Sequence, residues 1–187
     1  MNDDIHKALE VLKKGGVILY PTDTIWGLGC DATNFDAVER IYDIKMRPDH
    51  KSLLVLIDDA GRIPSYVEHI PEVAWDLLEV ADKPLTLIYP KAKNLAHNLV
   101  GEDESIGIRV TSDLFCQKLI QRFKKPIVST SANESGTPPP ASFDEISDKI
   151  KDQVDYIVNW KQDDTSKKTP SGIIKLGPKG EIKIIRK

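Results

Sequence analysis

The sequence predicts an α/β protein built on an open, twisted, mixed sheet with helices on its faces. Short apolar runs alternate along the chain with segments whose apolar residues recur at helical spacing. The chain ends in two strand-like runs on either side of "GPKG", a turn sequence that predicts a terminal hairpin and hence a mixed sheet. Because 187 residues suffice for one core, we expect residues 1–187 to form a single domain.

Five segments are predicted to be helical. In residues 3–14 apolar side chains recur at helical spacing from Ile5 to Leu12, Asp3 or Asp4 can cap the start, and two glycines follow the end. The other four segments share an amphipathic pattern and a proline, aspartate or serine near one boundary, and they are residues 35–45, 71–81, 112–123 and 143–150.

The remaining apolar runs are too short for helices and are rich in β-branched residues, which predicts strands. They lie at residues 17–20, 52–57, 85–89, 105–110, 126–130, 156–159 and, as the hairpin, 172–185. Residues 161–170, "KQDDTSKKTP", are polar and have no apolar periodicity. We expect them to form a flexible surface loop or lid and not a linker between domains.

Composition excludes several classes of protein. With 26 basic and 29 acidic residues the net charge is -3, so an anion site has to be built from a few cations focused in a cleft. Cys30 and Cys116 form no CxxC pair, and with four histidines no zinc site is expected. The charged N-terminus is not a signal peptide, and no apolar run reaches the ~18 residues of a membrane span. We therefore expect a cytoplasmic protein with free thiols, no metal ligands of its own and no membrane partner.

The first candidate anion site is the cationic segment "KMRPDHK", residues 45–51. Arg47 precedes Pro48, which favours extended geometry, and residues two apart in an extended segment share a side. Lys45, Arg47 and Lys51 could then converge on one anion. The alternative is a solvated helix C-terminus whose cations are favoured by the helix dipole.

Strand 105–110 offers a second cation. Ser105, Gly107 and Arg109 alternate with isoleucines and therefore share one face of the strand. An arginine among small residues has room for a carboxylate or a phosphate. A surface arginine on an edge strand is the alternative.

Two further segments place hydroxyl groups after apolar strands. Ser129, Ser131 and Asn133 have the same parity at the carboxyl end of strand 126–130, where α/β sheets bind ligands, although they could simply cap the turn. In "YPTDT", Thr22 and Thr24 likewise follow strand 17–20, with Asp23 alternating away, while Trp26 is expected in the core.

No Walker A, GxGxxG, HExxH or Ser-His-Asp pattern is present. The residues alone thus predict a cationic, hydroxyl-rich cleft for a phosphate or carboxylate ligand.

Five motifs, in this order, resemble the YrdC-like family of L-threonylcarbamoyl-AMP synthases: "YPTDTIWGLGCDA", "KMRP" with "KSLLVLI", "IGIRV", "PIVSTSANESG" and "TPSGII". They span residues 15–176. The resemblance implies the YrdC-like fold with a deep basic groove. It also implies a nucleotidyltransferase that makes threonylcarbamoyl-AMP and pyrophosphate from L-threonine, bicarbonate and ATP. A separate tRNA threonylcarbamoyl-transfer complex would use the product to modify tRNA.

The resemblance assigns roles to matching positions. The residues that correspond to threonine contacts are Thr24, Arg109, Ser131 and Ser171. Those that correspond to ATP contacts are Lys45, Arg47, Lys51, Ser105, Asn133 and Arg186. The catalytic set is Lys45, Arg47, Ser131 and Asn133. No residue corresponds to a metal ligand, and Mg²⁺ is expected to bind mainly through ATP.

The sequence departs from the family pattern at "DKPLT" (82–86) and "PSGII" (170–174), and also at Ser52 and Ala141, and none of these positions belongs to the catalytic set. A second class of function uses the same groove differently. The protein would then be a module that binds tRNA or double-stranded RNA without synthase activity. The net charge of -3 and the absence of an RNA-module motif favour the synthase.

Overall fold

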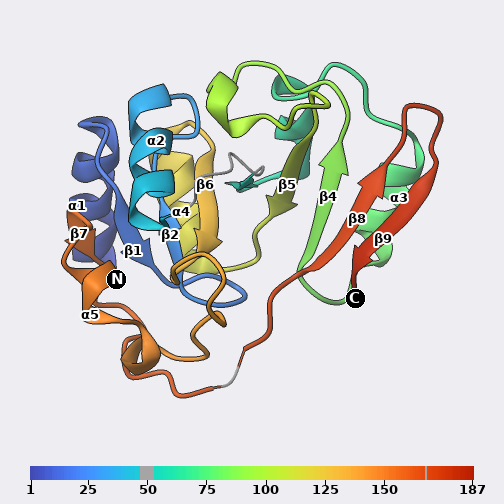
Figure 1. The fold of residues 1–187 in the computed structure, drawn as a ribbon. Helices are drawn as coiled ribbons and strands as arrows, with labels where there is room; N and C mark the ends of the chain where they lie inside the picture. Colours follow the sequence, from blue (N-terminus) through green and yellow to red (C-terminus); the bar gives the residue numbers. More distant parts are fainter. Residues whose placement is uncertain (47–52, 167) are drawn as a thin grey trace.

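The computed structural model describes residues 1–46, 53–166 and 168–187. Its strands form an open nine-stranded sheet in the order β7-β1-β2-β6-β3-β5-β4-β8-β9 (Figure 1). Their bounds are β1 Ile18–Tyr20, β2 Gly27–Gly29, β3 Leu54–Ile57, β4 Leu85–Tyr89, β5 Ile106–Val110, β6 Ile127–Ser131, β7 Tyr156–Ile157, β8 Gly172–Leu176 and β9 Ile182–Arg186. The predicted α/β class is confirmed.

The sheet is mixed, as the terminal hairpin predicted. β1 and β7, β3 and β5, and β4 and β8 pair in parallel, and every other neighbouring pair is antiparallel. The α-helices are α1 Asn2–Lys13, α2 Phe35–Ile44, α3 Val73–Val80, α4 Leu114–Phe123 and α5 Asp148–Lys151. Three 3-10 helices lie at Ala60–Ser65, His97–Leu99 and Phe143–Glu145.

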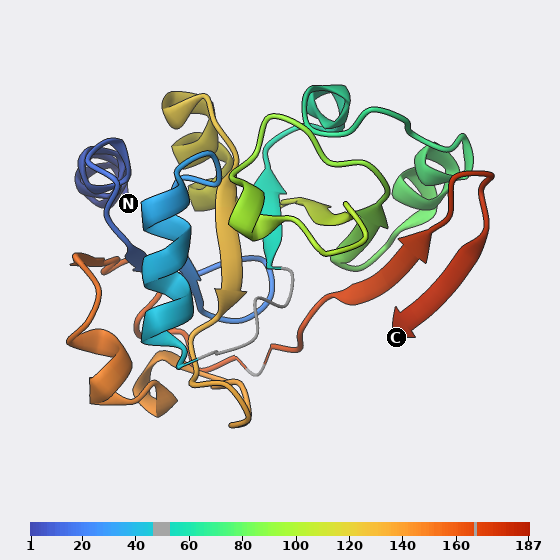
Figure 2. The same ribbon diagram turned by 45° about the horizontal axis from the view of Figure 1, so that its top comes forward.

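Strand alternation divides the core between the two faces of the sheet. In β3, Val55 and Ile57 join a cluster with the buried side of α2, whereas Leu56 joins a cluster with α1 and α4. Figure 2 shows α2 in front of the sheet and α1 with α4 on its far side. The helices α1 and α4 cover only part of the second face, the one that carries Leu56. The uncovered part of this face matters most for function.

Small residues continue that second face where the helices leave it. Leu56 pairs with Ile127 under α4, and two residues along the same strands Leu54 pairs with both Ser129 and Gly107. Because side chains on a strand return to the same face every second residue, these positions lie on the face of Leu56 but beyond its helical cover. This uncovered area becomes the floor of the cavity described below.

Three local predictions are wrong or incomplete. The expected helix 143–150 is a 3-10 turn followed by the one-turn α5, with Ile146 between them buried in the core. Neither Asp3 nor Asp4 caps α1, whose N-cap is Met1. Asp4 instead accepts hydrogen bonds from Asn159 and Tyr156. Strand β2 was not predicted, since two of its three residues are glycine.

The glycines of β2 allow a tyrosine to cross it. The Tyr20 hydroxyl donates to the Val128 carbonyl, 3.1 Å away across β2. A Cβ on Gly29 would lie 2.6 Å from Tyr20 Cε1 and 2.9 Å from the Val128 oxygen, closer than atoms pack.

Gly29→Ala is therefore expected to lower the free energy of unfolding by about 1–3 kcal/mol, the range for overpacking a buried site. Gly172→Ala is the matched control, because its Cβ would meet nothing closer than 3.6 Å. Urea denaturation of the two variants measures the difference. Equal unfolding midpoints would show that β2 adjusts without loss.

Candidate functional site

A cavity of about 580 Å³ opens on the uncovered face of the sheet. Its walls come from segments far apart in the sequence. Its polar and charged lining residues are Thr24, Thr86, Asp103, Ser105, Arg109, Ser129, Thr130, Ser131, Ser171, Lys175 and Arg186. The structure thus brings together seven polar residues singled out from the sequence, Thr24, Ser105, Arg109, Ser129, Ser131, Ser171 and Arg186.

Small side chains make the room. A Cβ on Gly107 would lie 3.3 Å from both Leu54 Cβ and Thr86 Cγ2, so the strands approach closely there. Ser105, Gly107 and Arg109 all line the cavity, as strand parity predicted. The small residues Ser105 and Gly107 therefore leave room for the cavity, and Arg109 on the same face of β5 supplies its cation.

Arg109 is the most deeply placed cation of the cavity. It is 3% exposed and lies on β5, between β3 and β4, so the alternative of a surface arginine on an edge strand is wrong. Its Nη2 lies 3.1 Å from Asp23 Oδ1, but these atoms are not aligned for a hydrogen bond. Within the described residues, the Nε and Nη2 of Arg109 have no hydrogen-bond acceptor. Such buried donors favour an anion in the cavity.

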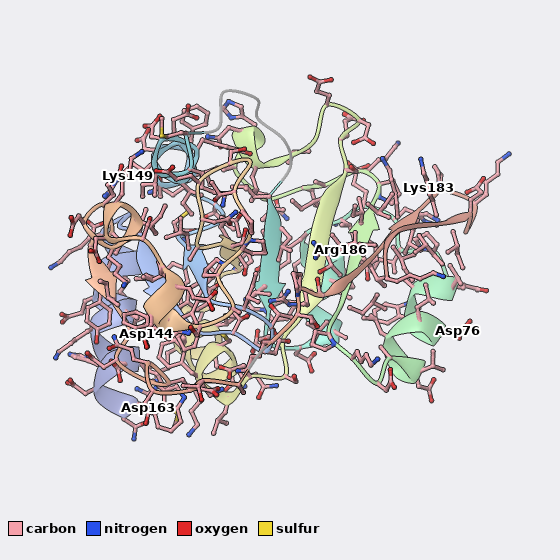
Figure 3. The ribbon with its side chains drawn as sticks, turned by 60° about the horizontal axis from the view of Figure 1, so that its bottom comes forward. Asp76, Asp144, Lys149, Asp163, Lys183 and Arg186 are labelled. Atoms are coloured by element: carbon pink, nitrogen blue, oxygen red, sulfur yellow. The ribbon has the colours of Figure 1, made fainter. Side chains whose placement is uncertain are left out.

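A second guanidinium stands nearby. Arg186 lies at the open end of the β8–β9 hairpin, paired with Ile173 of β8, and it lines the cavity. Figure 3 shows Arg186 nearer the middle of the molecule than Lys183, which lies further out on the same strand. The Arg186 Nε donates to the Ser171 carbonyl at 2.8 Å. Burial, together with the positive charge of Arg109, lowers the pKa of Arg186. The two cations thus destabilise each other, and a bound anion would relieve the repulsion.

The hydroxyl of Ser171 has a different partner. It lies 2.8 Å from the Thr86 hydroxyl, and both side chains are buried. Thr86 was not singled out from the sequence. Its signal is one polar residue within the apolar run "LTLIY", which becomes meaningful once β4 is known to lie between β5 and β8.

An ion pair marks the other end of the cavity. The Ser105 hydroxyl donates to Asp103 Oδ1 at 2.5 Å, and Lys175 Nζ pairs with the second oxygen of the same carboxylate. The hydrogen bond from Lys175, followed by that from Ser105, lowers the pKa of Asp103 to about 2. Asp103 and Lys175 were also not predicted from the sequence, since neither belongs to a recognisable motif.

Lys45 lies behind the cavity wall. Its side chain is 4% exposed, so the alternative of a solvated helix end is wrong for this residue. Its Nζ donates to the carbonyls of Ser131 and Asn133 at 2.6 and 2.7 Å, which fastens α2 to the loop after β6. Neither Lys45 nor Asn133 lines the cavity. Their contact with ATP stays a prediction.

The other two predicted cations, Arg47 and Lys51, lie outside the described residues. Trp26 is 6% exposed, and its ring centroid lies 4.9 Å from that of Phe143, so the prediction of a core position is confirmed. It also lines the cavity. Asp23, expected to alternate away from Thr22 and Thr24, does not line the cavity, and it forms the ion pair with Arg109.

The described residues contain no group of three or more histidine, cysteine or acidic side chains placed to hold a metal ion. Cys30 and Cys116 are free and buried, and burial raises the pKa of both thiols. In the part of the chain that the structure describes, no helix is long and apolar enough to cross a membrane.

Comparison with known proteins identifies the family to which this chain belongs. The family model Sua5_yciO_yrdC, described as "Telomere recombination", matches residues 10–187. The chain belongs to this YrdC/Sua5 family. A protein of Pseudoalteromonas translucida named threonylcarbamoyl-AMP synthase is 39% identical over 158 residues, which cover 83% of this chain and 84% of the relative. A Coxiella burnetii protein of the same name is 32% identical and covers 89% of this chain and 90% of the relative.

Solved structures agree. E. coli YciO matches all of this chain and 90% of its own, with a TM-score of 0.86 and 29% identity. P. abyssi Sua5, solved in complex with L-threonine, has a TM-score of 0.82 and 28% identity. That match covers 92% of this chain but 50% of Sua5, so the chain spans half the length of that relative.

Proposed function

We propose that this protein is an L-threonylcarbamoyl-AMP synthase, a nucleotidyltransferase that uses L-threonine, bicarbonate and ATP. The observation that carries the proposal is Arg109, a buried guanidinium in a cavity of about 580 Å³. Among the described residues its Nε and Nη2 have no hydrogen-bond acceptor, although Nη2 is ion-paired with Asp23. Bidentate pairing suits the carboxylate of an amino acid. The relatives named above support the choice of L-threonine and of this reaction.

In this proposal Arg109 binds the threonine carboxylate, and Thr24, Ser131 and Ser171 surround the rest of the amino acid. Bicarbonate takes up a proton and loses water to give carbon dioxide. The amine of threonine captures this carbon dioxide and releases a proton to solvent, which leaves a carbamate. A carbamate oxygen attacks the α-phosphorus of ATP, and the bond to the departing pyrophosphate breaks. Since the carbamate is already a nucleophile, no strong general base is required. The residues act by positioning the reactants and stabilising charge.

ATP is proposed to lie along the side of Ser105 and Arg186, with Lys45, Arg47, Lys51 and Asn133 near its phosphates. The described cavity wall offers hydroxyls and cations but no carboxylate cluster, which suits Mg²⁺ carried by the phosphate oxygens and not by a protein cage. When bound, Mg²⁺ would neutralise charge on the triphosphate. The product would pass in the cytoplasm to a tRNA threonylcarbamoyl-transfer complex.

The first test is a pyrophosphate-release assay with purified protein. We expect release only when ATP, L-threonine and bicarbonate are all present, together with formation of the adenylate. Omitting each component in turn is the control. ATP turnover that ignores threonine would refute the proposal. Tight, salt-sensitive binding of tRNA or double-stranded RNA without turnover would favour the RNA-binding alternative.

A further inference from the structure

Thr22 is buried beside the cavity without lining it, and its hydroxyl makes three contacts. It donates to the carbonyl of Ile25 at 2.8 Å and accepts from the backbone N–H of Thr24 at 3.0 Å. The third contact is the hydroxyl of Thr24, also at 3.0 Å.

Counting protons settles the direction of that third contact. A hydroxyl has one proton to donate, and the proton of Thr22 goes to Ile25, whose carbonyl can only accept. The proton between the two hydroxyls must therefore come from Thr24. Thr24 is 4% exposed and lines the cavity. Because that proton goes to Thr22, the Thr24 oxygen could serve a ligand in the cavity only as an acceptor.

We infer that Thr22 is a positioning residue that makes Thr24 a fixed hydrogen-bond acceptor for the bound amino acid. The inference rests on the proposed function. The group that Thr24 recognises must be a proton donor of the substrate, either an N–H of the amino group or the β-hydroxyl. A substrate hydroxyl that did not donate a proton to Thr24 would leave the Thr24 oxygen without a donor. A substrate with an aliphatic side chain, such as valine, would do the same.

The test compares Thr22→Val, which is isosteric but has no hydroxyl, with Thr22→Ser, which keeps the hydroxyl. Calorimetry measures the Kd of L-threonine, L-valine and L-serine for each protein, and thermal unfolding checks its fold. Thr33→Val is the matched control, because Thr33 bonds Asp31 on a turn that does not line the cavity.

We expect Thr22→Val to weaken L-threonine binding about tenfold, as loss of one buried hydrogen bond does, and Thr22→Ser to restore it. If Thr24 accepts from the β-hydroxyl, Thr22→Val also loses the preference for threonine over valine. If it accepts from the amino group, all three ligands weaken equally. Either pattern supports the inference.

Unchanged affinity and preference in folded Thr22→Val would overturn the inference, and so would an equal loss in Thr22→Ser. Should Thr22→Val not fold, Thr24→Val replaces it, because that change leaves the bond from Thr22 to Ile25 in place; wild-type threonine binding by this variant would overturn the inference too. A wild-type protein that binds none of the three amino acids contradicts the proposed function itself, which is a separate result.

Discussion

Replacing Arg109 by lysine should lower kcat/KM for L-threonine by about 100-fold or more, a loss of roughly 2–4 kcal/mol of transition-state stabilisation. Lysine keeps the positive charge beside the buried Asp23, so the protein should still fold. It cannot reproduce the planar pair of donors that Arg109 offers to a carboxylate. Steady-state kinetics with threonine as the varied substrate gives the measurement, and most of the effect should appear as a higher KM.

Arg122→Lys is the control for Arg109→Lys. Arg122 is an exposed residue on α4, and its replacement should leave both kinetics and stability unchanged. Folded Arg109→Lys with kcat/KM close to that of the wild type would mean that the carboxylate is held elsewhere.

The second large effect is expected at Lys45. Lys45→Met would leave the carbonyls of Ser131 and Asn133 without their charged donor, at a cost of about 2–4 kcal/mol in the free energy of unfolding. The loop that presents Ser131 would also lose its tie to α2. Displacement of a substrate-positioning group by about 1 Å can slow turnover on the order of 100-fold. Chemical denaturation measures the change in the free energy of unfolding. Pyrophosphate release, assayed at a temperature where the variant is still folded, measures the change in turnover.

Lys149→Met is the matched control for Lys45→Met. Lys149 pairs with Glu134 on the same loop, but its side chain is 55% exposed, so its removal should change stability by less than about 1 kcal/mol. The experiment also separates two roles for Lys45. If Lys45 binds phosphate and does not hold the loop, stability will stay at the wild-type value while KM for ATP rises.

The fold was predictable where local signals were strong. Alternating apolar runs and helical periodicity located most elements, and "GPKG" marked the final hairpin. Strand β2 was not predicted, because glycine has a low propensity for strands. It forms where Tyr20 and β6 pack against it. The order of the strands could not be predicted either. β6 lies between β2 and β3, which precede it by about 70 to 100 residues, and no local pattern specifies such a pairing.

For the site, strand parity correctly grouped Ser105 with Arg109, and Ser129 with Ser131, on the face that lines the cavity. Parity failed at Asn133, which lies past the end of β6, where the alternation of a strand no longer applies. Asp103 and Lys175 could not be found this way, because each becomes relevant only through pairing with the other.

The scattered origin of the cavity walls has a consequence for how the protein folds. Lining residues run from Thr24 to Arg186 and include the strand β8 that pairs with β4. A fragment that lacks either Thr24 or β8 would lack part of the pocket wall, so we expect substrate recognition to arise late in folding, after slow long-range pairing. A ligand would then bind the complete native state alone and protect the whole sheet at once. Its signature in hydrogen exchange would be slower exchange in β8 and β2 together, at opposite ends of the pocket, and not a local change around one loop.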